Sequence, residues 1–180
     1  MTWTIDPSHS SVGFKVRHLG LSTVRGRFTE VRIEDVSFDP ADVTTARGRV
    51  LISTASVSTG DGKRDGHLSS PDFFDAPTHP DMVFEVTGVE GSGDEYRVRG
   101  SLTIKGISRE VELTGEFLGD AQDPYGNHKA GFSVNGEINR TDWGLSWNVP
   151  LDAGRLLVGE KVKLEIEIQL LEQAAVAAGA

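Results

Sequence analysis

Five histidines are the side chains of this chain best suited to acid–base or metal chemistry. They are His9, His18, His67, His79 and His128. None of them pairs at the i, i+4 or short-loop spacing of a zinc site, and the chain has no cysteine that would complete one. We therefore expect no bound metal, no disulfide and no thiolate catalysis. Our interpretation is that most of these histidines are loop or rim residues bonded to backbone or carboxylates.

Other catalytic motifs are missing as well. No Gly-x-Ser-x-Gly elbow accompanies the serines, and Ser10 beside His9 belongs to an ordinary step from a turn into a strand. No Gly-x-Gly-x-x-Gly fingerprint or P-loop occurs, so nothing supports a nucleotide cofactor. We expect a protein that is not an enzyme and that holds no cofactor.

Two polar clusters stand outside strand-like sequence. The first contains Arg64, Asp65 and His67, and the second contains Asn139, Arg140, Asp142 and Asn148. One interpretation is a polar collar at the mouth of an apolar tube, and the other is a solvated helix and a salt-bridged loop. Trp143 and Trp147 suit such a rim, because indole has an apolar body and a polar tip, but they equally suit packing at a barrel end. The residues alone leave these alternatives open.

Long strands with one apolar face must position these groups. From Tyr96 to Ile104 every second residue belongs to an apolar face, and the same alternation runs through residues 107–117, 132–138 and 162–170. Gly100, Gly115 and Gly136 lie on the apolar face. A glycine there adds nothing to a packed core, so we interpret the three as keeping the interior partly empty. The alternative is that they are bends needed for barrel curvature.

About eight such strands make up the chain. They cover residues 12–17, 24–38, 47–56, 82–89, 96–104, 107–117, 129–140 and 160–171, with a bulge or bend near 29–31. Residues 39–42 and 91–94 read as turns, and residues 61–68 read as a short helix over one end. Eight antiparallel strands can close into a barrel that holds side chains or one small ligand. We predict an all-β, extended eight-stranded antiparallel up-and-down barrel with a short helix near one end.

Length, charge and the lack of long apolar segments limit the domain organisation, the partners and the location that we expect for this barrel. The 180 residues fit a single domain over 1–172, followed by a tail at 173–180 that we expect to be frayed. The net charge of -9 argues against a nucleic-acid partner. After Met1 there is no basic n-region and no apolar h-region, and no segment is long and apolar enough to span a membrane. We expect an unexported, cytoplasmic protein.

Several segments, taken together, resemble the YceI-like family. They are Trp3 to Ser10 leading to Val12 to His18, then Arg64 to Leu68, Leu102 to Gly106, and Asn139 to Gly144. The resemblance runs from Trp3 to about Glu172, and the stretch from Trp143 to Glu160 is most similar to unexported members. It implies a lipocalin-like barrel whose lumen takes a long isoprenoid or related lipid, with no established catalytic residue. Many members carry a periplasmic signal peptide, and we expect none in this chain.

This resemblance implies a protein that binds, transports or sequesters a prenyl quinone, a prenyl alcohol or a related amphiphile. The expected lumen residues are Phe14, Val16, Phe28, Phe84, Val98, Gly100, Leu102, Leu113, Phe132, Val134, Gly136 and Trp143. The expected polar rim consists of His18, Arg64, Asp65, His67, Asn139, Arg140, Trp147 and Asn148.

Two other classes of function compete with lipid binding. One is an enzyme acting on an isoprenoid or quinone, with His18, His67 or Asp65 as acid or base near the mouth. The other is an interaction module, in which the outward Arg97, Arg99 and Lys105 form a homodimer or partner surface. Transient membrane contact also fits a lipid carrier.

Overall fold

The computed structural model describes residues 2–173 and consists mainly of strands. The long strands are β2 (Ser11–His18), β3 (Ser22–Phe28), β4 (Val31–Asp39), β5 (Asp42–Ser53), β7 (Asp81–Ser92), β8 (Glu95–Ile104), β9 (Ile107–Gln122), β10 (His128–Asn139) and β11 (Val158–Glu172). The short strands are β1 (Trp3–Ile5) and β6 (Val57–Ser58), and the helical segments are α1 (Gly62–Ser69), η1 (Pro7–His9), η2 (Thr54–Ser56), η3 (Arg140–Trp143) and η4 (Asp152–Gly154). The expected frayed tail lies, apart from Gln173, outside the described residues.

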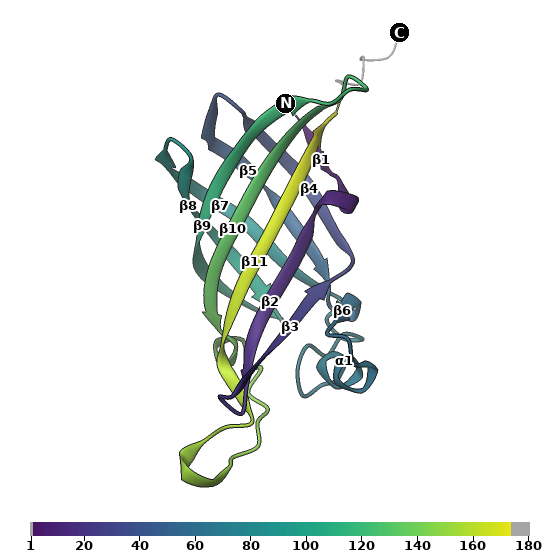
Figure 1. Ribbon diagram of the computed structural model, residues 1–180, viewed down its shortest axis with the longest axis vertical. Helices are drawn as coiled ribbons and strands as arrows, with labels where there is room; N and C mark the ends of the chain where they lie inside the picture. The colour runs from purple at the N-terminus through teal and green to yellow at the C-terminus, as the bar shows by residue number, and fades with distance from the viewer. Residues whose placement is uncertain (1, 174–180) are drawn as a thin grey trace.

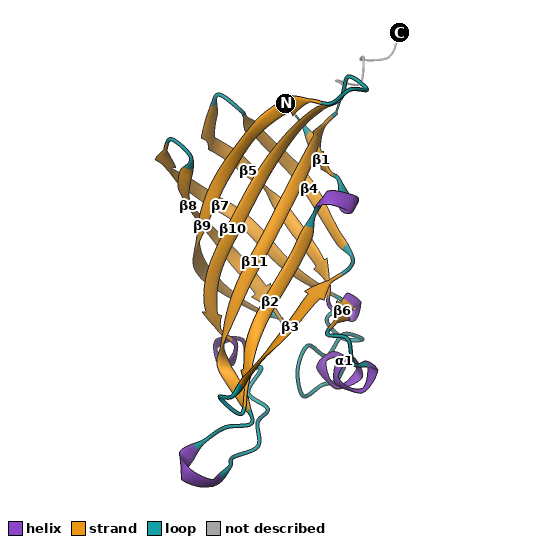
Figure 2. Cartoon of the chain, viewed as in Figure 1, coloured by secondary structure: helices purple, strands orange, loops and turns teal. Residues whose placement is uncertain are grey.

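All the strands belong to one antiparallel sheet that curls into a barrel (Figure 1). Their order is β4-β5-β7-β8-β9-β10-β11-β2-β3-β6, with β1 paired to β11. The helical segments lie at the ends of the strands and not over their middle (Figure 2). The predicted all-β antiparallel barrel with one short helix is therefore confirmed.

The strand count differs from the prediction because residues 24–38 form two strands instead of one. Thr29 and Glu30 separate β3 from β4: Thr29 N donates to Ser56 O over 3.2 Å, and Ser53 N donates to Glu30 O over 3.0 Å. The chain thereby leaves its pairing with β2 and begins its pairing with β5. The change of apolar parity seen in the sequence marks this break. Residues 2–173 therefore form nine long strands.

The two edges of the curled sheet are tied together at both ends of the seam. Near the N-terminus, Thr2 forms a bridge with Ser37 of β4 while the neighbouring β1 pairs with β11. At the other end, β6 follows β5 through η2 and pairs with β3, where Phe28 lies opposite Val57. The short strands that the sequence pattern missed are thus the segments that close the barrel.

Trp3 seals the end of the barrel that lies away from α1. Its ring stacks on Phe38 with 4.5 Å between centroids, and its Nε1 donates to Phe38 O over 3.4 Å. Phe117 and Phe132 surround Phe38 at 6.4 and 5.2 Å. This aromatic cluster accounts for the burial of Trp3.

His128 braces the same end through two carboxylates. Its Nε2 lies 2.6 Å from Asp120 Oδ2, and its Nδ1 lies 2.5 Å from Glu172 Oε2. The hydrogen bond to Asp120, followed by the one to Glu172, raises the pKa of His128 above its ordinary value. As an imidazolium, the ring can donate to both partners and so connects β9, β10 and β11.

The interpretation that inward glycines keep the interior empty is wrong for Gly100 and Gly136, which neighbouring side chains cover, whereas Gly115 lies in the cavity wall. The ring of Phe84 covers Gly100, and the side chain of Leu113 covers Gly136. A Cβ at Gly100 would also lie 2.6 Å from Glu85 O, and one at Gly115 would lie 3.1 Å from Val98 Cγ2. Gly100 and Gly136 each accept a large side chain from a neighbouring strand, as in the rescue of a strand glycine by an aromatic ring.

We predict that Gly100→Ala destabilises the protein by about 1–3 kcal/mol, because the methyl group displaces the Phe84 ring and meets a backbone carbonyl. Gly88→Ala on β7 is the matched control, since nothing lies within 4 Å of its added Cβ. It should be neutral or stabilise by about 0.4–1 kcal/mol. Urea unfolding measures both variants, and equal stabilities would contradict the close packing at Gly100.

Candidate functional site

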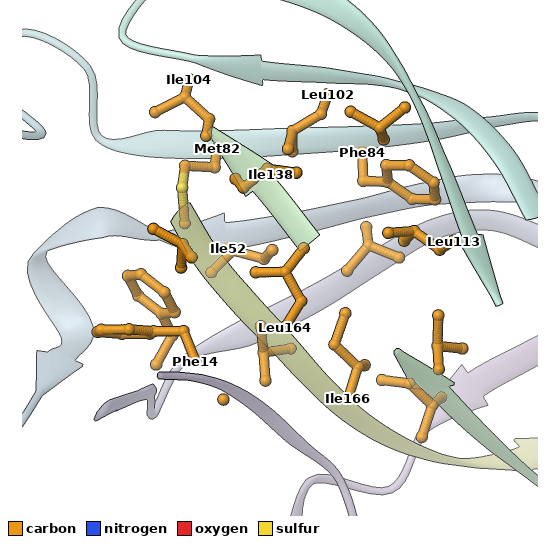
Figure 3. Close-up of a pocket in the computed structure, with 18 of the residues that line it drawn as sticks. Phe14, Ile52, Met82, Phe84, Leu102, Ile104, Leu113, Ile138, Leu164 and Ile166 are labelled. Atoms are coloured by element: carbon orange, nitrogen blue, oxygen red, sulfur yellow. The ribbon is translucent and has the colours of Figure 1, made fainter. Parts of the chain in front are cut away.

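An elongated apolar cavity of about 610 Å³ occupies the inside of the barrel. Every long strand contributes inward side chains to its wall, for example Phe14, Val24, Ile33, Val50, Phe84, Val98, Leu113, Val134 and Leu164. Figure 3 shows Phe14, Leu164 and Ile166 facing Leu102 and Phe84 across the same space, and the side chains drawn there are hydrocarbon except for a methionine sulfur. Strand alternation produces most of this wall, because each strand turns its apolar face inward, and α1 and the loops complete it at one end.

The cavity has the shape of a tube. Its wall includes Phe38 and Leu170 at the Trp3 end and His67 and Leu157 at the α1 end. β11 has 15 residues, which at about 3.3 Å per residue gives about 50 Å of strand. At about 30 Å³ for each water-sized group, 610 Å³ holds on the order of 20 such groups in a row or a loose bundle. The space suits a long flexible chain better than a compact polar metabolite.

Positive side chains gather where the tube meets α1. The polar residues of the wall at this end are Arg17, His18, Thr59, Lys63, Arg64, His67 and Arg140. Among the described wall residues the single carboxylate is Glu116, which lies opposite Glu95 toward the other end of β9. A chain of net charge -9 therefore has a cationic cavity mouth.

Helix α1 is fixed over this mouth by its own polar residues. Asp61 caps the helix by accepting from Lys63 N at 3.0 Å and Arg64 N at 3.2 Å. Asp65 Oδ1 accepts from the Thr59 N and Oγ1 atoms at 2.9 and 2.6 Å. Arg64 Nε donates to the same Thr59 hydroxyl over 2.7 Å. Asp65 thus anchors the helix outside the cavity wall, which corrects its predicted place in the rim.

His67 contributes to an aromatic floor at the mouth. Its ring meets Trp147 edge-on at 4.5 Å and Phe73 at 5.1 Å. Its Nε2 lies 2.9 Å from Asp72 Oδ2, so its carboxylate partner is Asp72 and not Asp65. The loop after α1 folds back over the helix, since Phe74 N donates to Leu68 O over 2.9 Å, and this return brings Phe73 and Asp72 to the histidine.

Arg140 is a buried cation beneath this floor, with only 5% of its surface exposed. It donates to the carbonyl oxygens of Leu145 (2.5 Å), Gly159 (2.9 Å), Trp147 (3.1 Å) and Val158 (3.3 Å). Its carbon Cζ lies 5.7 Å from the centroid of the Phe73 ring. Burial lowers the pKa of the guanidinium from its ordinary value. Arg140 therefore holds the loop between η3 and β11 in place by its hydrogen bonds.

Three further residues predicted for the site support the mouth from outside the cavity wall. Asn139 Oδ1 caps η3 by accepting from Thr141 N at 3.0 Å. Asn148 exchanges hydrogen bonds with the Val158 backbone, donating to its O at 2.7 Å and accepting from its N at 3.1 Å. Trp143 is 2% exposed and donates from Nε1 to Leu102 O over 2.9 Å. Local capping and loop hydrogen bonds satisfy the polar groups of these three residues. They therefore do not belong to the predicted cavity lining, and neither do Gly100, Gly136 and Asp65.

The remaining predicted residues do lie in the cavity wall. They are Phe14, Val16, Phe28, Phe84, Val98, Leu102, Leu113, Phe132 and Val134 in the lumen, and His18, Arg64, His67, Arg140 and Trp147 toward the mouth. That they bind a ligand stays a prediction.

Sequence reasoning missed several members of the wall. These include Arg17, Lys63, Phe73 and Phe74 at the mouth and Ile33, Val36, Phe38 and Val43 deeper inside. The Phe73–Phe74 pair in an otherwise polar loop was a usable signal. Arg17 gave no such signal. Its place in the strand alternation predicts an outward side chain, and it reaches the mouth only because β2 ends there.

Two observations on the described part of the chain bear on other kinds of site. No helix within residues 2–173 is long and apolar enough to cross a bilayer. The same residues contain no group of three or more His, Asp or Glu side chains placed to hold a metal ion. The expectation that the protein needs no metal stays a prediction.

Comparisons with known proteins cover almost the whole chain. The YceI-like domain matches residues 3–170. The UPF0312 protein of Pectobacterium atrosepticum is 33% identical over 165 residues, which span 92% of this chain and 82% of that relative. The UPF0312 protein of Staphylococcus aureus strain N315 is 36% identical over 164 residues, spanning 91% and 93%.

Solved structures share the same architecture. A YceI protein of Campylobacter jejuni is 34% identical and has a TM-score of 0.75, covering 97% of this chain and 99% of that one. A polyisoprenoid binding domain from Saccharophagus degradans has a TM-score of 0.67 at 15% identity, over 95% and 98% of the two chains, and this likeness shows the fold alone.

We predict that Arg140→Met destabilises the protein by about 2–4 kcal/mol, because four carbonyls at the mouth lose a largely buried donor. The same change at the exposed Arg25 should alter the free energy of unfolding by less than about 0.5 kcal/mol. Urea unfolding monitored by tryptophan fluorescence measures both. A mild effect at Arg140 would show that the loop is held by its other contacts.

Proposed function

This chain belongs to the YceI-like family, and from that premise we propose that it binds a long-chain polyisoprenoid or related amphiphilic lipid inside the barrel. The observation that carries the proposal is the cavity of about 610 Å³, whose wall is mainly hydrocarbon and has most of its positive side chains at one mouth. A tail in the tube and a head group at the mouth match both parts of this wall.

The size of the cavity gives a reason for a ligand to fill it. An empty closed cavity destabilises a folded protein by about 24 cal/mol per Å³, so 610 Å³ corresponds to a destabilisation of about 15 kcal/mol. This figure is an upper bound here, because the scale comes from closed cavities. Typical domains have only about 5–15 kcal/mol of total stability. A lipid tail that packs against the wall recovers part of the lost van der Waals contact and removes its own surface from water.

For the ligand we propose a prenyl quinone or prenyl alcohol, which the protein carries or sequesters. Their head-group oxygens accept hydrogen bonds, and the mouth supplies donors on Arg17, Arg64 and His67. The polyisoprenoid-binding neighbour from Saccharophagus degradans supports this ligand class through the shared fold. Because the wall offers many more apolar contacts than polar ones, tail length should dominate affinity and the head group should set orientation.

An enzyme acting on the same lipid is the second candidate, favoured by one observation. His67 Nε2 lies 2.9 Å from Asp72 Oδ2 beside the mouth, which is a distance suited to a histidine oriented by a carboxylate. The two side chains are 37% and 53% exposed, so both stand close to water. Chemical conversion of a bound quinone or alcohol during incubation would favour this candidate over a carrier.

Mass spectrometry of an organic extract of the purified protein tests the proposal directly. We expect a long-chain apolar lipid at up to one molecule per barrel. After delipidation, a prenyl quinone or prenyl alcohol should bind saturably. An extract free of lipid, together with no saturable binding, would rule out the carrier function.

A pair of tryptophan variants localises the binding to the lumen. Val134 lies in the cavity wall on β10, and the next residue, Asn135, is exposed on the outer face. Val134→Trp should lower lipid affinity at least about tenfold, because the indole fills volume that the tail needs. Asn135→Trp should leave affinity unchanged. Titration of delipidated, folded variants gives the comparison, and equal affinities would place the ligand elsewhere.

A further inference from the structure

Large exposed apolar side chains concentrate at the mouth end of the barrel. In residues 2–173, six such side chains are exposed, and four of them lie at this end: Leu21 (73%), Val149 (39%), Ile107 (38%) and Leu156 (38%). Leu118 and Tyr125 lie toward the opposite end, on β9 and in the turn after it. The asymmetry places most of the apolar surface beside the cavity entrance.

Three of these side chains, Leu21, Val149 and Leu156, belong to one protruding element, which we call the mouth tip and define as residues 19–21 and 149–157. Its longer part folds back on itself, because Pro150 bridges Leu156 and Leu157 N donates to Val149 O over 3.1 Å. Leu19 N donates to Leu157 O over 2.9 Å and joins the two parts. In Figure 1 the segment before β11 extends beyond the ends of the strands, next to the turn between β2 and β3.

Exposed arginines surround the mouth tip. Residues 11–29 contain four basic residues (Lys15, Arg17, Arg25 and Arg27) and no acidic one, and residues 144–159 contain Arg155 and Asp152. These two segments together have a net charge of +4, while the whole chain has -9. Lys15 pairs with Glu165, but the four arginines are exposed and have no ion-pair partner in the part of the chain that the structure describes.

We infer that the mouth tip docks on the surface of a bilayer that contains anionic lipid, so that the cavity opens toward the membrane. Leu21 and Leu156 enter the boundary between head groups and acyl chains, and Arg25, Arg27 and Arg155 face the lipid phosphates. Leu157 in the mouth tip and Arg17 beside it also line the cavity. The docking surface is therefore continuous with the entrance through which a lipid must pass.

The chemistry of the surface selects a membrane over a protein partner. The exposed leucines project from two short segments with arginines around them. A fluid anionic surface accepts this arrangement without shape complementarity, whereas a stable protein partner needs a broad, packed patch. Asp152 is the one acidic residue within the mouth tip and opposes docking only locally. The inference takes its biological purpose from the proposed function, but the docking itself can be measured separately.

Vesicle sedimentation with delipidated protein tests the inference. We expect binding to vesicles of phosphatidylcholine with about 30% phosphatidylglycerol, weak binding to phosphatidylcholine alone, and loss of binding as salt rises. The double variant Leu21→Glu/Leu156→Glu should bind anionic vesicles at least about tenfold more weakly. The control is Leu118→Glu, the same substitution at one leucine that is 58% exposed away from the mouth, and it should bind as the unmodified chain does. Leu21→Glu alone matches it in charge and should still weaken binding.

A charge-reversal pair tests the electrostatic part independently. Arg25→Glu/Arg27→Glu should weaken vesicle binding several-fold and flatten its salt dependence, because fewer cations face the phosphates. Arg97→Glu, an exposed arginine on β8 away from the mouth tip, should have little effect. If the unmodified chain does not bind anionic vesicles, or if the mouth variants and their controls lose binding equally, the inference is wrong.

Binding of a water-dispersed short-tail prenyl quinone by the same variants separates this inference from the proposed function. The mouth-tip variants should keep lumen affinity while losing vesicle affinity. If vesicle binding behaves as expected but the lumen takes no lipid, the proposed function fails and the docking surface stands. If the lumen takes lipid but vesicles are ignored, the docking inference fails alone.

Discussion

A strand with one apolar face is stable only when that face leaves water, and each long strand of this chain has such a face. In the part of the chain that the structure describes, no helix covers the middle of the sheet, so the sheet must bury its apolar face against itself by curling (Figure 2). The barrel and its hydrocarbon interior follow from this one constraint. Glycines on the inner face make room for large neighbouring side chains. Phe84 lies against Gly100 and Leu113 against Gly136, so these bulky groups stay along the wall.

The two ends of the tube differ in ways that give a bound amphiphile a direction. Trp3 and Phe38 fill the far end with stacked rings, and His128 ties three strands beside them. At the other end the wall contains arginine, lysine and histidine, and Arg140 supports the loop that frames the opening. An apolar tail therefore meets mainly hydrocarbon along the tube, with a few polar wall residues such as Ser37, Arg47 and Glu116, and hydrogen-bond donors gather at the mouth to meet its head group.

The alternation of apolar and polar residues was enough to predict the fold class and the inward residues of most strands. The break at Thr29 and Glu30 appeared in the sequence only as a change of parity, because a bulge and a strand end produce the same pattern. The role of Gly100 depends on Phe84, which lies on the neighbouring strand and covers the glycine with its ring. The alternation of residues along one strand does not show which side chain of another strand will cover it.

The mouth was harder to predict because loops decide it. His67 is close to Asp65 in the sequence, yet the loop after α1 returns to pair it with Asp72. Asn139 and Asn148 look like rim residues by composition, but local backbone groups need their side chains as caps and loop ties. Arg140 was identified in the sequence, and the structure adds the reason for its burial: four carbonyl oxygens converge on one guanidinium.

The central claim is that removal of a lipid tail from water drives binding in the tube. It is tested most directly by calorimetric titration of the delipidated protein with a series of alkyl quinones that share one head group and differ in tail length. At about 0.8 kcal/mol per buried CH₂, affinity should rise about fourfold per carbon and then level off at a tail on the order of 20 carbons, when the cavity of about 610 Å³ is full. An affinity that follows the head group and ignores tail length would contradict the account.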